Sequence, residues 1–243
     1  GYWEFDGVDD DLEGPPCNTI LSAESSIELW VNFDDVSTRQ TIISGYISTT
    51  PTETNRWDFE VNNSRIQGGF HGNGYFTSGG STLNTNNWYH LTFVLSSNTL
   101  KFYLNGEENT SQSCSGFNFG GPTIELGIGD RNNSSIGHLN GKVGEVRIYK
   151  KTLTEAEVFQ NYNASLIRYQ NAFSNVGVNL GPGITNITEL IAYYDFNNRA
   201  CFDDSENQIE NSYLMEAIGH YLMSLRNLTL TLWLLMELRQ QHL

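Results

Sequence analysis

Two carboxylates at alternate positions, Asp58 and Glu60, have the spacing in this chain that most resembles acid–base chemistry. Residues two apart on a β-strand share one face, and cleavage of a glycosidic bond uses two carboxyl groups. Alternate polar residues are also typical of the solvated face of a half-buried strand. His71, His90 and His138 have no serine or cysteine partner at a recognisable spacing. We therefore expect a solvated face at Asp58 and Glu60, and we predict no catalytic residue.

A second group of acidic side chains could supply oxygen ligands to calcium. Asp6, Asp9, Asp10 and Asp11 lie in one short segment, and Asp130 could join them. Calcium takes about six to eight oxygens, so this set offers only part of a coordination shell. Calcium binding and an acidic turn without metal both stay open. The candidate ligands are Asp6, Asp9, Asp10 and Asp130.

A third group consists of aromatic rings flanked by amides. The range 68–76 is rich in glycine and could present its rings to a sugar. Flat apolar rings pack on the C–H faces of sugars, and amides hydrogen-bond to sugar hydroxyls. Ordinary packing in strands and hairpins would explain the same residues. The candidate ligand-binding residues are Trp57, Phe70, His71, Asn73, Tyr75 and Phe76.

The overall charge argues against two classes of partner. The chain has 13 basic and 28 acidic residues, which gives a formal net charge of -15. A protein of this charge repels phosphate backbones and anionic lipid head groups. We therefore expect no nucleic-acid partner and no membrane partner.

The three cysteines, Cys17, Cys114 and Cys201, show neither a zinc-binding spacing nor an even number for a disulfide framework. We expect three free thiols, which is consistent with folding in a reducing cytosol. A bridge between Cys17 and Cys114 stays open.

The elements that position these groups are predicted by hydrophobic periodicity. In residues 27–33 and 88–95, apolar side chains occupy every second position, which predicts strands with one buried face. The range 27–33 would be half-buried, with Glu28 on its outer face, and the range 88–95 would be a central strand. Asn105-Gly106 suits a tight hairpin with positive φ. Turn residues recur about every eight to twelve positions, which is typical of an all-β sandwich or jelly roll.

The period changes after the last of these strands. Thr154 and Glu157 form a capping box, which predicts a short helix near 154–162. The glycine-containing range 165–189 predicts a linker or an extended wrap.

The end of the chain falls into two parts. Residues 190–211 open with the strong strand pattern Leu190-Ile191-Ala192-Tyr193-Tyr194-Asp195-Phe196. Residues 212–243 are a poorly specified tail, either a terminal helix packed on an apolar surface or a non-native tail from a shifted reading frame. Arg226 interrupts the only candidate for a membrane span.

Six motifs occur together in a fixed order. They are the ranges 5–10, 27–31, 87–94, 101–106, 126–129 and 144–149. The last motif includes residues 153–158 as well. Over about residues 2 to 164 they resemble the laminin-G-like, concanavalin A-like lectin/glucanase jelly roll. The resemblance implies an all-β fold, with two antiparallel sheets in a sandwich. The range 159–169 resembles the version found in virion structural proteins of tailed, often marine, bacteriophages.

One departure from this family lies in the order of its parts. Family modules usually begin with a strand like 190–196 and reach the Phe5-Asp6-Gly7-Val8-Asp9-Asp10 phrase only afterwards. Either the chain is a fragment of a tandem array, or the later strand folds back into the vacant place. We expect the second, with residues 190–196 paired in cis with the strand ending near Tyr149. A further departure is Gly144, where family members commonly carry an aspartate, and it weakens the case for calcium.

The resemblance implies three functions that the fold alone does not separate. We expect first a non-catalytic binding or structural module on a virion or extracellular surface, for adhesion and for binding of glycans, with other virion or array subunits as partners. A glycoside hydrolase is the alternative, although the E-x-D-x-x-E strand of the glucanases does not occur here. A purely architectural virion subunit is the third.

Overall fold

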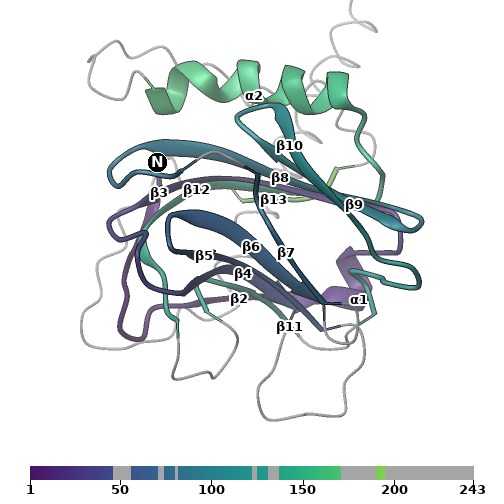
Figure 1. Cartoon of the computed structure of the whole chain (residues 1–243), viewed down its shortest axis with the longest axis horizontal. Helices are drawn as coiled ribbons and strands as arrows, with labels where there is room; N and C mark the ends of the chain where they lie inside the picture. The colour runs from purple at the N-terminus through teal and green to yellow at the C-terminus, as the bar shows by residue number, and fades with distance from the viewer. Residues whose placement is uncertain are drawn as a thin grey trace, which may run out of the picture. The chain divides into compact units, whose positions relative to one another are not determined.

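The fold is seen in a computed structural model, which describes residues 1–45, 56–70, 74–79, 82–121, 125–130, 137–170 and 190–194. All of them belong to one unit, residues 1–209. Two antiparallel sheets face each other across an apolar core (Figure 1). The predicted all-β, two-sheet jelly-roll sandwich is therefore confirmed.

One sheet has seven strands, in the order β1-β12-β3-β8-β9-β10, with β13 paired to β12 as well. Its strands are β1 (Trp3–Asp6), β3 (Ser25–Phe33), β8 (Trp88–Ser96), β9 (Thr99–Leu104), β10 (Glu107–Ser113), β12 (Asn140–Tyr149) and β13 (Leu190–Tyr194). The central position predicted for 88–95 is confirmed, because β8 lies between β3 and β9.

The other sheet has six strands, in the order β2-β11-β4-β5-β6-β7. Its strands are β2 (Leu12–Pro16), β4 (Gln40–Gly45), β5 (Trp57–Asn62), β6 (Arg65–Phe70), β7 (Gly74–Thr77) and β11 (Glu125–Ile128), and the short helix α1 (Cys17–Ile20) follows β2. A ring stack joins the two sheets, because Phe59 of β5 lies parallel to Phe93 of β8 with centroids 3.6 Å apart.

The turn between β9 and β10 has the predicted hairpin form. Asn105 has a φ of 52° and Gly106 a φ of 83°. Positive φ at both central residues gives the twist that a tight hairpin needs. The predicted conformation of Asn105-Gly106 is confirmed.

Helix α2 (Glu155–Gln170) lies over the outer face of the seven-stranded sheet (Figure 1). It begins at the predicted capping box, where the Thr154 N–H donates to Glu157 Oε2 at 2.8 Å and the Glu157 N–H donates to Thr154 Oγ1 at 3.3 Å. The helix continues beyond the expected end near residue 162, so the prediction of a linker from residue 165 is wrong for residues 165–170. The reason is that Ser165 and Tyr169 continue the face that packs on the sheet.

The packing of α2 changes the surroundings of β3. The Trp30 indole stacks on the Tyr169 ring, with centroids 4.5 Å apart, and donates Nε1–H to Ser165 Oγ at 2.9 Å. Every residue of β3 is buried, Glu28 included. The expectation of a half-buried strand with Glu28 on a solvated face is therefore wrong, because the helix covers that face.

The outer edge of β12 pairs with two separate strands. Residues Trp3–Asp6 of β1 lie opposite Val143–Asn140, and Leu190–Tyr194 of β13 lie opposite Tyr149–Val146. Thus β13 lies where the displaced order of the sequence led us to expect it. Residues 195–211 lie outside the described residues.

Three other expectations concern single residues or segments. Cys17 and Cys114 are buried and free, so the bridge between them is not formed. Cys201, the range 171–189 and the tail 212–243 lie outside the described residues. Neither described helix is long and apolar enough to cross a membrane.

Candidate functional site

The outward face of the six-stranded sheet carries polar side chains at its centre. On β5, Trp57, Phe59 and Val61 are buried in the core, so Asp58 and Glu60 point to the opposite face. The two carboxylates therefore occupy the middle of a sheet with strands on either side.

Strand register places further polar and small residues beside these carboxylates. Directly opposed residues of antiparallel strands share a face. Ser44 and Gly69 lie on either side of Asp58, and Thr41 and Gln67 lie on either side of Glu60. The Asp58 row continues to Gly127 and Glu13 on one side and to the register position of Tyr75 on the other, and the Glu60 row continues to Thr77. We call the set Thr41, Ser44, Asp58, Glu60 and Gln67 the polar face.

The carboxylate of Glu60 is held by two donors. Arg39 Nε lies 2.7 Å from Glu60 Oε2, and Gln67 Nε2 donates to the same oxygen at 3.2 Å. Glu60 is 0% exposed, whereas the Arg39 side chain is 38% exposed. The ion pair therefore joins a buried carboxylate to a partly exposed guanidinium.

The expectation of a solvated face at Asp58 and Glu60 is wrong. Asp58 is 3% exposed and Glu60 is 0% exposed. The physical reason is that β5 is an inner strand, and Arg39 and Gln67 replace water around the Glu60 carboxylate. The two carboxylates are therefore held in a polar, buried layer on the outward side of the sheet.

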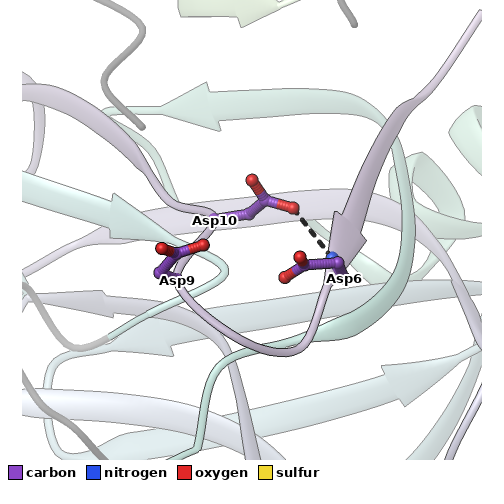
Figure 2. A group of neighbouring side chains, drawn as sticks. All are labelled: Asp6, Asp9 and Asp10. Atoms are coloured by element: carbon purple, nitrogen blue, oxygen red, sulfur yellow. Dashed lines mark hydrogen bonds between the residues drawn. The ribbon is translucent and has the colours of Figure 1, made fainter. Parts of the chain in front are cut away.

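The acidic turn after β1 brings three of the four predicted metal ligands together. Oxygens of Asp6, Asp9 and Asp10 all lie within 4.8 Å of one another (Figure 2). Asp6 Oδ1 accepts from the Val8 N–H at 2.7 Å, and Asp10 Oδ2 accepts from the Asp6 N–H at 2.8 Å. These bonds shape the turn.

The surroundings of this turn disfavour the ionised form of two of its aspartates, Asp10 and Asp11. Burial raises the pKa of Asp10, and the neighbouring charges of Asp6 and Asp9 add to the rise. Burial, followed by the charges of Glu13 and Asp130, raises the pKa of Asp11 to about 6. A bound cation would relieve this repulsion, but the three carboxylates supply only part of the oxygen shell that calcium needs. The turn therefore fits calcium in charge and incompletely in ligand number.

Asp130, the fourth predicted ligand, does not belong to this group. It is buried, its backbone carbonyl accepts from Ser44 Oγ at 2.9 Å, and its Oδ1 lies 3.9 Å from Nδ1 of His138. Asp130 therefore contacts Ser44 of the polar face through its backbone and is not part of the cluster of Asp6, Asp9 and Asp10.

Of the predicted ligand-binding aromatic residues, Trp57 lies in the core. Trp57 is 0% exposed and donates Nε1–H to the Phe119 carbonyl at 3.1 Å, so its ring is not available to a sugar. This burial follows from alternation, because Trp57 shares the core face of β5 with Phe59. Phe70 ends β6, and Tyr75 and Phe76 lie on β7. His71 and Asn73 lie outside the described residues.

Sequence reasoning missed most of the polar face. A β-bulge between Thr41 and Ile43 breaks the alternation of β4, so both Ile42 and Ile43 are buried and Thr41 and Ser44 are not recognisable as one face. One signal in the sequence could have identified Gln67 as part of an outward face. In β6, Arg65, Gln67 and Gly69 alternate with Ile66, Gly68 and Phe70.

Comparisons with solved structures show the same fold at low sequence identity. A candidate carbohydrate-binding protein from Bacteroides ovatus matches 86% of this chain with a TM-score of 0.54 and 15% identity. This chain spans about half of that protein, 54% of its length. A heptameric SAP-like pentraxin from Limulus polyphemus matches 66% of this chain and 81% of its own, with a TM-score of 0.54 and 13% identity.

A further similar structure is the CBM40 of the Ruminococcus gnavus IT-sialidase bound to alpha2,3 sialyllactose. It matches 65% of this chain and 96% of its own, with a TM-score of 0.52 and 10% identity. No curated protein matches the chain in a sequence comparison. The family profile described as the concanavalin A-like lectin/glucanases superfamily matches residues 6–159. With that match over most of the described strands and the same sandwich in the similar structures, the chain belongs to the concanavalin A-like lectin/glucanases superfamily.

Proposed function

We propose that the chain is a non-catalytic glycan-binding module whose ligand contacts the polar face of the six-stranded sheet. Its fold is that of a lectin superfamily, and similar structures include a carbohydrate-binding module bound to sialyllactose. Fold alone does not assign function. The proposal therefore rests on the groups that the polar face offers to a ligand.

The observation that carries the proposal is the chemistry of the two central rows. Sugar hydroxyls both donate and accept hydrogen bonds, and the rows supply carboxylates at Asp58 and Glu60 and hydroxyls at Thr41 and Ser44. Gly69 and Gly127 lie in the same row as Asp58, and the lack of a side chain there permits close approach of a ring.

The hydrogen-bond partners of Glu60 favour binding over hydrolysis. A glycoside hydrolase needs one carboxyl group that carries a proton to the leaving oxygen. Oε2 of Glu60 instead accepts from Arg39 and Gln67, so these two side chains orient the carboxylate as an acceptor that a sugar hydroxyl could also use. Hydrolysis of a polysaccharide remains the alternative function, to be distinguished by experiment.

A glycan array followed by titration calorimetry tests the proposal. We expect binding by the wild type and a loss of about ten-fold or more in affinity for Glu60→Gln, since a hydrogen bond to a charged group contributes about 1.5 to 3 kcal/mol. Glu108→Gln is the matched control, because Glu108 is also ion-paired, with Lys101 at 2.6 Å, but lies on the other sheet. Equal affinity of both variants and the wild type would contradict the site.

The same glycans separate the alternatives. Release of new reducing ends by the wild type, abolished in Asp58→Asn, would replace the binding proposal with a hydrolase. Absence of both binding and cleavage across a broad array would leave the architectural role.

The setting of the module is a proposal of its own. We place it on a virion or extracellular surface, where it serves adhesion and contacts other virion or array subunits. The net charge of -15 and the phage-like range 159–169 support this setting. Labelled protein should attach to cells that display the glycan found on the array, and the free glycan should compete with this attachment. Attachment that is not reduced by the free glycan would argue against adhesion through the polar face.

A further inference from the structure

The edge of β12 is filled by two strands that run in the same direction. As β1 proceeds from Trp3 to Asp6, its partners descend from Val143 to Asn140. As β13 proceeds from Leu190 to Tyr194, its partners descend from Tyr149 to Val146. Along this edge β13 therefore comes first and β1 second, the reverse of their order in the chain.

The junction between the two strands is occupied by α2. Only Gly144 and Glu145 separate the two paired stretches of β12. The Glu145 N–H donates to the Tyr169 hydroxyl at 2.8 Å, and a Cβ at Gly144 would lie 2.5 Å from the Tyr169 ring. Tyr169 of the helix thus contacts β12 between the stretch that pairs with β1 and the half-edge from Val146 to Tyr149.

Pairing at this half-edge is local. Four register pairs join β13 to β12, and no other described strand pairs with β13. An edge without a partner exposes backbone N–H and C=O groups that must be satisfied by another strand or by water. Any strand with the sequence of 190–194 in this register would satisfy them equally well.

The connection to β13 is long enough to reach another molecule. Nineteen residues, 171–189, separate Gln170 from Leu190, and an extended chain of that length spans about 60 Å. A domain of this size has a diameter of about 40 Å. The strand can therefore reach the same edge of a neighbouring copy.

We propose that the half-edge Val146–Tyr149 is a strand-acceptor site that takes the 190–194 strand of a second copy of this chain. Exchange of an identical element makes the same contacts in trans as in cis, which makes it a low-cost route to assembly. A connection of nineteen residues keeps the cis strand at an effective concentration of about millimolar. Exchange therefore dominates where copies are crowded, as on a repetitive surface.

Complementary cysteine variants test the exchange. Ile148 lies opposite Ala192 in the register, so one protein carries Ile148→Cys and another carries Ala192→Cys, both with Cys201→Ser. The two proteins are mixed at high concentration, β13 is released with mild denaturant, and the mixture is returned to native buffer and oxidised. We expect a covalent heterodimer linked between positions 148 and 192, at least ten-fold above the control mixture.

The control mixture pairs Ile148→Cys with Glu107→Cys, which places an exposed cysteine on β10 at the far edge of the same sheet. A chain with both Ile148→Cys and Ala192→Cys reports the cis pairing. If that chain links internally at high yield while the mixture gives no more heterodimer than the control, exchange is excluded. Val146→Cys with Tyr194→Cys reads the same register and replaces the first pair if Ile148→Cys does not fold.

Discussion

Charged residues buried beneath α2 are the unusual feature at the scale of single residues. Glu28 and Arg147 are almost completely buried, with Arg147 Nη1 3.7 Å from Glu28 Oε2. Asn161 of α2 donates to Glu28 at 3.0 Å, and Arg168 Nη1 lies 2.7 Å from Glu145 Oε2. Removing one partner of such a network leaves a buried charge without compensation. The network therefore fixes the position of the helix, whether or not it adds to stability.

Glu28 gives a pH prediction. Burial raises its pKa to about 7, against the lowering effect of Arg147. The folded state thus holds a proton that the unfolded state releases above pH 4.5 or so, and stability falls as pH rises from about 4.5 to about 7. Glu28→Gln cannot titrate, so this loss, at most about 3 kcal/mol, should be absent from its free energy of unfolding.

Urea unfolding of both proteins at pH 5 and pH 8 measures the effect. His90 has the opposite influence, since burial lowers its pKa to about 3 and makes acid destabilising. The contribution of His90 is expected in both proteins. The quantity to compare is therefore the difference in free energy of unfolding between the variant and the wild type at each pH. An identical difference at pH 5 and pH 8 would refute the assignment to Glu28.

Calcium binding by Asp6, Asp9 and Asp10 of the acidic turn stays a prediction. Burial raises the pKa of Asp10 and the charges of Asp6 and Asp9 add to the rise, and a cation should relieve the part that comes from these charges. We expect calcium to raise the melting temperature of the wild type, a chelator to reverse this, and Asp9→Asn to abolish most of the shift. Glu107→Gln, which removes an exposed charge elsewhere, should retain it. A melting temperature that is insensitive to calcium would identify an acidic turn without metal.

At the scale of elements, the sequence predicts local signals better than contacts between distant segments. The capping box at Thr154 and the Asn105-Gly106 hairpin are encoded within a few residues, and both are confirmed. The burial of Glu28 and of Glu60 depends on α2 and on neighbouring strands that arrive from elsewhere in the chain. Alternation assigns a residue to a face, but it does not reveal what covers that face.

The helix start can be tested directly. Thr154→Ala removes the side-chain oxygen that accepts from the Glu157 N–H, and loss of such a cap costs about 1 kcal/mol. Asn163→Ala, on the exposed side of the same helix, should instead be neutral or slightly stabilising because alanine has the higher helix propensity. Chemical denaturation of the two variants gives the comparison. A stability loss of equal size in both would show that the cap has no specific role.

At the scale of the molecule, the fold was predictable because six family motifs occur in a fixed order along the chain. The residues of the candidate site were not predictable in this way. The polar face is assembled from β4, β5 and β6, and its members gain meaning only from strand register. Trp57 shows the opposite case. Its indole ring is of the type that stacks on sugars, but it is buried in the core. Composition identified groups capable of binding, and only the three-dimensional arrangement showed on which side of the six-stranded sheet each of them lies.

The two half-strands on the edge of β12 also bear on how this domain can be re-engineered. Because β13 ends beside the point where β1 begins, a short peptide bridge from Tyr194 to the residue before Trp3 would merge them into one strand. The chain could then be opened at the Asn105-Gly106 turn, with every strand of both sheets kept in place. Such a circular permutant would have its new ends on the far side of the seven-stranded sheet, away from the polar face.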